Sequence, residues 1–154
     1  MTYCGHCGTR YADTDTWPRT CGSCGRTTYR NPLPVAVALV PVAGGRLLVV
    51  RRDIEPRRGH LALPGGYMDH GETWQEAVVR ELREETGVRF APSDVRLFDV
   101  HSNRECVAVF GVLPAIEALP DHRDAEVSEV TTAGPDTPLA FPGHIAVAAR
   151  YFGG

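Results

Sequence analysis

Three glutamates lie close together in the stretch from Gly66 to Val88, which reads GYMDHGETWQEAVVRELREETGV. On a helix, Glu81 and Glu85 lie one turn apart on a single face, with Glu84 beside them. Like charges at this spacing repel one another, and a divalent cation removes the repulsion. Mg²⁺ prefers oxygen ligands and typically combines one or two carboxylates with water and substrate phosphates. The spacing therefore indicates a metal site that could hold a phosphorylated substrate.

An isolated run of glutamates has a second interpretation. It can belong to a solvated helix face with salt bridges, such as Glu76 to Arg80. Arg80 directly precedes Glu81 in this chain, so a planar fork of donors stands beside the carboxylates. The residues around the run, described below, favour the metal site.

The residues before the glutamates predict a tight turn and then a helix. Paired glycines in Pro64-Gly65-Gly66 permit the φ > 0 geometry of a tight loop. Thr73 and Glu76 form a capping-box pattern, which predicts a helix from about residue 74 to residue 86 that Gly87 ends. The core-facing stripe of this helix recurs every four residues and consists of Trp74, Val78 and Leu82.

Four cysteines form two matching pairs, Cys4-x2-Cys7 and Cys21-x2-Cys24, with thirteen residues between the pairs. Each pair lies in a C-x-x-C-Gly turn, where glycine lets backbone amides point at the sulfurs. Two such turns supply four thiolates for one tetrahedral, structural Zn²⁺ per chain. Two disulfides are the alternative. No secretory signal precedes Cys4, which predicts a reducing, cytoplasmic location with free thiols.

The fifth cysteine and the histidines receive no catalytic or metal-binding role. Cys106 lies in an apolar run and is expected to be a small buried residue. His6 is a substitute zinc ligand that the four cysteines make unnecessary. The other histidines considered show no metal-ligand spacing; they are His60, His70, His101 and His144.

The composition predicts a small enzyme rather than a nucleic-acid-binding or membrane protein. The chain has 154 residues, 43% of them hydrophobic, which is enough for one catalytic domain and a zinc module. A net charge of −3 argues against a protein that grips long nucleic acid through its phosphates. No apolar run approaches the ~20 residues of a membrane span.

The remaining sequence divides into a turn-rich ribbon, residues 1–30, and a second domain, residues 31–154. The second domain has strand patterns on both sides of the central helix, and a mixed sheet between helices, an α/β fold, suits that order. The expected strands are 35–42, 46–51, 95–100, 106–113 and 127–131, and a last helix is expected at 143–151.

The stretch from Gly66 to Val88 fits the pattern G-x5-E-x7-R-E-U-x-E-E-x-G-U, where U is aliphatic. The fixed and aliphatic places are taken by Gly66, Glu72, Arg80, Glu81, Leu82, Glu84, Glu85, Gly87 and Val88. This is the Nudix box, so the chain resembles the Nudix hydrolases, which cleave nucleoside diphosphates linked to another moiety. The resemblance implies an α/β/α sandwich with a mixed sheet at 31–154, preceded by a small zinc ribbon at 1–30.

The order of the motifs is similar to that of one branch of the family. A four-cysteine ribbon followed by YRNP, RDIEPRRG and LPGG resembles the zinc-ribbon Nudix hydrolases, which include NADH pyrophosphatases. Those enzymes carry an SQPWPFPxS element after the box, and residues 95–109 contain nothing like it. The resemblance therefore implies a dinucleotide-like substrate without implying a preference for NADH.

The resemblance also implies roles for the site residues. The ligands it implies for Mg²⁺ or Mn²⁺ are the Gly65 carbonyl, Glu81, Glu84, Glu85 and Glu126. Arg80 would orient the glutamates by ion pairing, and Glu72 would brace the loop. The metals would neutralise the diphosphate and lower the pKa of a bound water. Glu126 is the first candidate for the general base and Glu129 the second.

Substrate contacts are expected outside the box. Tyr29 and Tyr67 match positions where NADH pyrophosphatase-like enzymes place aromatic rings against a base. Arg51 or Arg52 ends a strand near the expected metals and could contact phosphate. An ordinary core or surface role is the alternative for each of these four residues.

Three classes of function fit these features. The first is a hydrolase of small nucleotides such as ADP-ribose or NADH that releases a nucleoside monophosphate, and Nudix enzymes of this type are often homodimers. The second removes nucleotide caps such as NAD from RNA 5′ ends with the same chemistry, and it would need a basic groove. The third is a catalytically silent, nucleotide-binding Nudix module. Silent members usually lose a glutamate or arginine of the box, and this chain retains them all.

Overall fold

The computed structural model describes residues 1–12 and 16–153 of the chain. The chain falls into two compact units, Met1–Pro32 and Leu33–Gly154. Across the described residues, no helix combines the length and the apolar character needed to cross a membrane.

The N-terminal unit contains little regular structure. Strands β1 (Arg19–Thr20) and β2 (Thr27–Thr28) pair antiparallel in a two-stranded sheet. Among its described residues, the buried hydrophobic cluster consists of Cys4, Tyr11 and Cys21. A core this small does not offset the entropy lost when the unit is ordered, so the unit depends on a cross-link or a metal.

The second unit begins with five strands, continues through the central helix and ends with three strands and a second helix. Its elements are β3 (Leu33–Leu39), β4 (Pro41–Val42), β5 (Arg46–Arg52), β6 (Leu61–Ala62), β7 (Gly65–Tyr67), α1 (Trp74–Thr86), the 3₁₀ turn η1 (Pro92–Asp94), β8 (Arg96–Ser102), β9 (Cys106–Val112), β10 (Val127–Ala133) and α2 (Pro142–Gly153). The η1 turn is absent from the sequence prediction.

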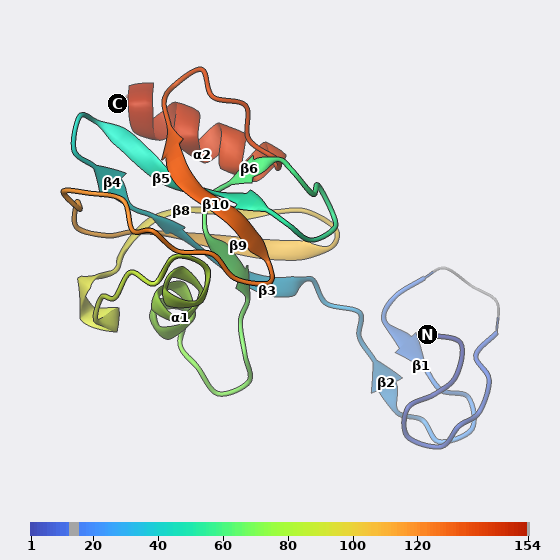
Figure 1. Cartoon of the computed structure of the whole chain (residues 1–154). Coiled ribbons are helices and arrows are strands. Elements are labelled where there is room, and N and C mark those ends of the chain that lie inside the picture. The colour runs from blue at the N-terminus through green and yellow to red at the C-terminus, as the bar shows by residue number, and fades with distance from the viewer. Residues whose placement is uncertain (13–15, 154) are drawn as a thin grey trace. The chain divides into compact units, whose positions relative to one another are not determined.

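Two sheets form the middle of this unit. In one, the strand order is β7-β3-β9-β8, with β3 and β9 parallel and the other neighbours antiparallel. In the other, β5 lies between β10 and β4 and also pairs with β6, all antiparallel. Figure 1 shows α1 and α2 on opposite sides of these strands. The predicted α/β/α sandwich with a mixed sheet is confirmed.

Two hydrophobic clusters flank β3, because successive side chains of a strand point to opposite faces of a sheet. Ala38 belongs to the cluster that contains Leu82 of α1. Its neighbour Leu39 belongs to the cluster that contains Val147 of α2. A helix therefore covers each face of the strand, which explains why its sequence is apolar at successive positions.

Helix α1 begins and ends where the sequence predicts. The Thr73 hydroxyl accepts a hydrogen bond from the Glu76 N–H at 3.3 Å, and the Glu76 carboxylate accepts one from the Thr73 N–H at 2.7 Å. Gly87 ends the helix in the left-handed conformation, with φ 74°. Because Glu76 takes part in this cap and Arg80 bonds to other glutamates, the alternative salt bridge between them does not form.

The strand expected at residues 35–42 is divided between the two sheets. Strand β3 ends at Leu39, and Pro41 begins β4, which pairs with β5. Proline has no N–H to donate, so it does not continue a central ladder. The other predicted strands and the last helix agree with the structure to within two residues at each end.

Two expectations about single residues are wrong in detail. Gly66 lies in the extended strand β7 opposite Ala36 of β3 rather than in a tight loop, and its φ is not positive. Cys106 is half-buried rather than buried, because it is the first residue of β9 and pairs with Leu33 at the start of β3.

Candidate active site and metal centres

The acidic face of α1 packs against the short strand β7. Glu85 is only 7% exposed, and its Oε2 accepts a hydrogen bond from the Gly65 N–H at 3.0 Å. Gly65 has φ 156°, and a Cβ at this position would collide with the carbonyl oxygen of Ala36. Glycine is therefore required where the chain passes this close to β3 and presents its amide to Glu85.

Gly66 leaves space for a side chain of α1, and its backbone conformation is not one that favours glycine. A Cβ at this position would lie 2.6 Å from Oε1 of Glu81, which is shorter than any ordinary contact. The Glu81 carboxylate thus occupies the volume that a side chain at residue 66 would fill. This close approach replaces the loop geometry that the sequence suggested as the reason for this glycine.

Arg80 joins α1 to the segment around β7 through every nitrogen of its guanidinium. Nε and Nη2 donate to the two carboxylate oxygens of Glu72 at 3.0 and 2.6 Å. Nη1 donates to Glu81 at 2.7 Å and to Glu84 at 3.2 Å, and Nη2 also donates to the Tyr67 carbonyl at 3.0 Å. The fork therefore orients two box glutamates and, through Glu72, braces the loop before the helix.

Negative charge exceeds positive charge at this site. Burial, opposed by the Gly65 amide and reinforced by the charge of Glu81, raises the pKa of Glu85 to about 8. Burial also raises the pKa of Glu81, although its hydrogen bond from Arg80 lowers it. A divalent cation would compensate these carboxylates. Because the available donors are oxygen atoms, the site suits Mg²⁺ or Mn²⁺.

Glu126 comes directly before β10. Its charge raises the pKa of Glu81, so the two carboxylates lie within electrostatic range of each other. Its backbone is tied to the residue that follows β5, because the Asp53 N–H donates to the Glu126 carbonyl at 2.7 Å. Glu129 is placed differently: its carboxylate accepts a hydrogen bond from Nε of Arg51 at 2.7 Å on the neighbouring strand.

The two candidate phosphate-binding arginines have different environments. Arg51 bonds to Glu129 and donates Nη1 to the Gly59 carbonyl at 3.0 Å. Arg52 lies close enough to Glu85 to lower its pKa, and its guanidinium carbon lies 5.2 Å from the centre of the Phe141 ring. Of the two arginines, Arg52 is therefore the one that we place in electrostatic contact with the buried carboxylate of Glu85.

The two candidate aromatic contacts belong to different units of the chain. The Tyr67 side chain is 63% exposed, and its backbone carbonyl accepts from Arg80, so it lies beside the acidic cluster. Tyr29 is 64% exposed and belongs to the N-terminal unit.

Two histidines near the site have contacts that the sequence does not reveal. His144 of α2 accepts a hydrogen bond from the Leu63 N–H at 3.1 Å through Nδ1, and its ring packs edge-on against Phe110 and Phe141. Burial lowers the pKa of His144 to about 4, so the ring is neutral at pH 7. His122 contacts the last turn of α1. Both contacts join segments far apart in sequence, and no local pattern marks them.

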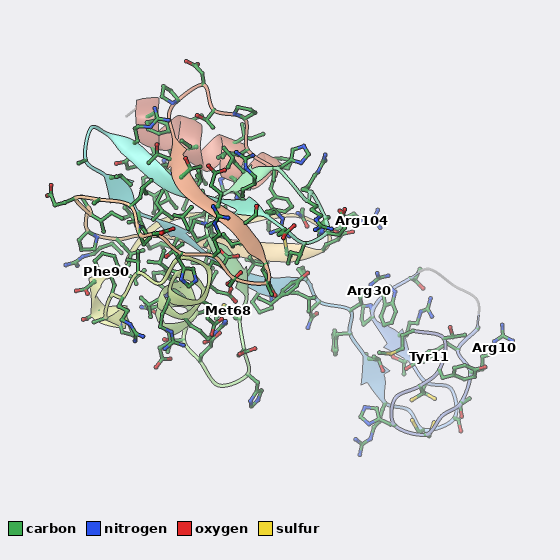
Figure 2. The ribbon with its side chains drawn as sticks, viewed as in Figure 1. Arg10, Tyr11, Arg30, Met68, Phe90 and Arg104 are labelled. Carbon is green, nitrogen blue, oxygen red and sulfur yellow. The ribbon has the colours of Figure 1, made fainter. Side chains whose placement is uncertain are left out.

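The four cysteines of the ribbon form a single cluster. Their sulfurs all lie within 4.8 Å of one another, with Cys4 and Cys24 at 3.8 Å and Cys7 and Cys21 at 3.6 Å. A tetrahedral zinc with Zn–S distances of ~2.3 Å places its sulfurs about 3.8 Å apart. Because a disulfide requires ~2.05 Å between its sulfurs, the alternative of two disulfides does not fit. Figure 2 shows the sulfur atoms of the ribbon gathered in one place.

Backbone amides prepare part of this cluster for a metal. The N–H groups of His6 and Cys7 lower the pKa of Cys4 to about 6. The Arg26 amide lowers the pKa of Cys24, but partial desolvation and the neighbouring sulfurs outweigh it and raise that pKa to about 11. Four sulfurs at these distances could hold a metal ion, and Zn²⁺, which binds the deprotonated thiolate, has the matching ligand preference and geometry.

Comparisons with known proteins agree with this geometry. A protein-family model described as the NUDIX domain matches residues 32–145 of the chain. Among solved structures, a NUDIX hydrolase from Nitrosomonas europaea matches with a TM-score of 0.78 and 27% sequence identity. That match covers 99% of this chain and 91% of the other.

Two curated proteins are similar to this chain over part of their length. An ADP-ribose pyrophosphatase from Methanocaldococcus jannaschii is 42% identical over 77 residues, which are 49% of this chain and 44% of the relative. An NAD-capped RNA hydrolase, NudC, from Chromobacterium violaceum is 38% identical over 88 residues, which are 56% of this chain and 32% of the relative. The chain spans less than half of the length of either relative.

The sulfur cluster predicts about one tightly bound Zn²⁺ per chain. Elemental analysis of protein purified without added metal should find it, because four sulfurs at tetrahedral spacing bind zinc strongly. The variant Cys4→Ser should lose most of this zinc, whereas Cys106→Ser, which changes a cysteine outside the cluster, should retain it. Wild-type protein without zinc, or two disulfides detected by mass spectrometry, would contradict the assignment.

The environment of His144 predicts a loss of stability in mild acid. The pKa of the buried His144 ring is about 4 in the folded state, whereas a histidine that is not buried has a pKa of 6.5. The unfolded state therefore binds the proton first as pH falls. The loss between these pH values is at most about 3 kcal/mol of unfolding free energy. Urea unfolding at pH 7 and pH 4.5 should show a smaller loss for His144→Asn, which keeps an acceptor but no titrating ring. Equal losses in both proteins would refute this.

Proposed function

The chain belongs to the Nudix family, and we propose that it hydrolyses the pyrophosphate bond of a nucleoside diphosphate joined to a second group. Water adds to one phosphorus and the bridging P–O bond breaks, which yields a nucleoside monophosphate and the phosphorylated second group. The main support for this function is the set of carboxylates on α1. One of them, Glu85, is buried against β7 and forms no ion pair within the part of the chain that the structure describes.

Mg²⁺ or Mn²⁺ would be held by Glu81, Glu84, Glu85 and the Gly65 carbonyl, with Glu126 as a further ligand. When bound, the metal neutralises the diphosphate and lowers the pKa of a bound water. Arg80 supports this role, since its Nη1 holds Glu81 and Glu84 in fixed orientations. The Gly65 amide holds Glu85 in the same way, so the ligands are oriented before any metal binds.

Glu126 would accept the proton of the attacking water. Its side chain is exposed and lies within electrostatic range of Glu81, which supports a place beside the metals and the substrate. A carboxylate in such a position can act as a general base. Glu129 is the weaker candidate, because Arg51 already pairs with it at 2.7 Å.

Substrate binding is proposed for residues around this cluster. Arg52 would contact a phosphate, since its charge reaches Glu85, and Arg51 remains a second candidate beside Glu129. Tyr67 would stack on the base, which its exposed ring and its position next to Arg80 support. Tyr29 remains a proposed base contact from the N-terminal unit.

We propose ADP-ribose and related dinucleotides as the substrate class. The similarity to the archaeal protein named ADP-ribose pyrophosphatase, 42% over 77 residues, supports this choice. The absence of an SQPWPFPxS element from residues 95–109 leaves no reason to expect a preference for NADH.

Removal of NAD caps from RNA is the second candidate function. The 38% identity to the Chromobacterium violaceum protein named NAD-capped RNA hydrolase favours it. An RNA substrate would extend beyond the cleaved diphosphate and would gain affinity from contacts with its own phosphates. A chain with a net charge of −3 offers limited support for such contacts, so a small dinucleotide is the first proposal.

The variant Glu85→Gln should fold normally and lose turnover by ~10²-fold or more, because it removes the charge of a metal ligand and little volume. Steady-state kinetics at saturating Mg²⁺ would measure the loss. Glu117→Gln, a matched change at an exposed glutamate outside the site, should leave kcat unchanged. Near-normal turnover in Glu85→Gln would remove this residue from the mechanism.

A substrate panel should distinguish the candidate functions. ADP-ribose, NADH, dGTP and a short NAD-capped RNA would each be incubated with Mg²⁺ or Mn²⁺, and the products identified by mass. We expect the highest kcat/KM for an ADP-linked diphosphate, with AMP released, because the site offers metals to a diphosphate and an exposed ring to a base. A clear preference for dGTP would refute the proposed substrate class, and a clear preference for the capped RNA would favour the second candidate.

A further inference from the structure

The loop between β9 and β10 brings Glu126 to the metal-binding helix. Its first part is fixed to β4 and the following turn, since the Ile116 N–H donates to the Pro41 carbonyl at 2.9 Å and the Ala43 N–H to the Ile116 carbonyl at 3.1 Å. Its last part, residues 121–126, carries the proposed base. The position of that part relative to α1 determines the distance from Glu126 to the box glutamates.

A histidine in this last part bonds to the end of α1. Nε2 of His122 lies 2.9 Å from the backbone carbonyl oxygen of Glu84. A carbonyl oxygen only accepts hydrogen bonds, so Nε2 carries the proton and donates it. The carbonyls of the last helical turn have no partner within the helix. His122 therefore satisfies a carbonyl of the same residue whose carboxylate takes part in the acidic cluster.

The His122 ring also packs on the residue that ends the helix. A Cβ at Gly87 would lie 3.2 Å from Nδ1 of His122, which is tighter than an ordinary contact. Glycine at this position therefore has two functions: it adopts the left-handed conformation of the cap, with φ 74°, and it leaves room for the imidazole. The ring is held by the hydrogen bond of Nε2, and Nδ1 lies over the space that a side chain at residue 87 would fill.

The backbone from Asp124 to Val127 forms a hydrogen-bonded turn. Oδ1 of Asp124 accepts hydrogen bonds from the N–H groups of Glu126 at 2.7 Å and Val127 at 2.8 Å. The Asp124 N–H donates to the Val127 carbonyl at 3.1 Å, and the Asp53 N–H donates to the Glu126 carbonyl at 2.7 Å. Only Arg123 lies between His122 and this turn, so the turn that carries Glu126 follows His122 almost directly.

We propose that His122 is a positioning residue that fixes Glu126 at its working distance from the glutamates of α1. The inference rests on the proposed hydrolysis and on Glu126 as the proton acceptor. Over residues 1–12 and 16–153, the bond from His122 to Glu84 is the one hydrogen bond that joins the 121–126 segment to α1. His122 itself does not touch the substrate; it acts through Glu126.

Two substitutions at residue 122 separate the hydrogen bond from the packing. His122→Leu fills similar space on Gly87 but cannot donate, whereas His122→Gln retains a donor at a similar reach. We expect kcat to fall ~10–100-fold in the leucine variant, because small misplacements of reacting groups have effects of this size. KM should stay within about threefold, and the glutamine variant should recover most of kcat. His70→Leu, a change of an exposed histidine, should behave like the wild type.

A double-mutant cycle tests whether the effect passes through Glu126. In a Glu126→Gln background, adding His122→Leu should lower kcat by less than about twofold, because residues that act as a unit are not additive. The full His122→Leu loss in that background, or unchanged kcat in either single variant, would overturn the proposal. A lower melting temperature with normal kcat would also overturn it, since it would show a purely structural contact.

Amide hydrogen exchange gives a result that does not depend on turnover. The peptide that contains residues 121–127 should exchange faster in His122→Leu than in the wild type or in His122→Gln, because its hydrogen-bonded turn is no longer fixed to the helix. Equal exchange in all three proteins would refute the positioning role. If no diphosphate is hydrolysed, the proposed function fails, and this measurement still decides whether His122 holds the segment.

Discussion

A shortage of positive charge at the acidic face of α1 is the constraint on which the site depends. Arg80 bonds directly to Glu72, Glu81 and Glu84, and Arg83 also reaches Glu84 at 3.6 Å, so two guanidiniums face three carboxylates. Glu85 is buried as well; the Gly65 amide donates a hydrogen bond to it, and burial raises its pKa to about 8. Buried carboxylates with too few partners are costly. A divalent cation is the partner that such a set of oxygen donors accepts, and the proposed chemistry follows from that requirement.

The fold places the acidic face of α1 against the backbone of Gly65 and Gly66, which have no side chains to keep the carboxylates away. Gly65 and Gly66 let β7 pair with β3 while α1 packs against it, and a Cβ on either residue would meet the Ala36 carbonyl or the Glu81 carboxylate. Strand β3 supplies the rigid support, because its alternating side chains are buried under α1 on one face and α2 on the other. The site therefore combines a helix with fixed ends, a glycine-lined strand and a buried sheet.

Local features of the site could be predicted from the sequence, and its long-range contacts could not. The capping box, the Gly87 stop and the spacing of Glu81, Glu84 and Glu85 depend on residues a few positions apart, so the sequence pattern specifies them. The pairing of Arg51 with Glu129 and the contact of His122 with Glu84 join residues 78 and 38 positions apart. Which side chains meet across such distances depends on strand register and loop path. The sequence likewise marked Gly66 as important but suggested a turn, whereas the reason is the space taken by a carboxylate from another element.

Electron paramagnetic resonance of Mn²⁺ tests most directly whether the carboxylates of α1 bind a divalent metal. Zinc-loaded protein would be titrated with Mn²⁺, and the free ion counted in the wild type, in Glu81→Gln and in Glu85→Gln. The charge shortage predicts that the wild type binds Mn²⁺ at the α1 site and that each variant binds it much more weakly, with the zinc content unchanged. Mn²⁺ binding that is the same in all three proteins would contradict the account.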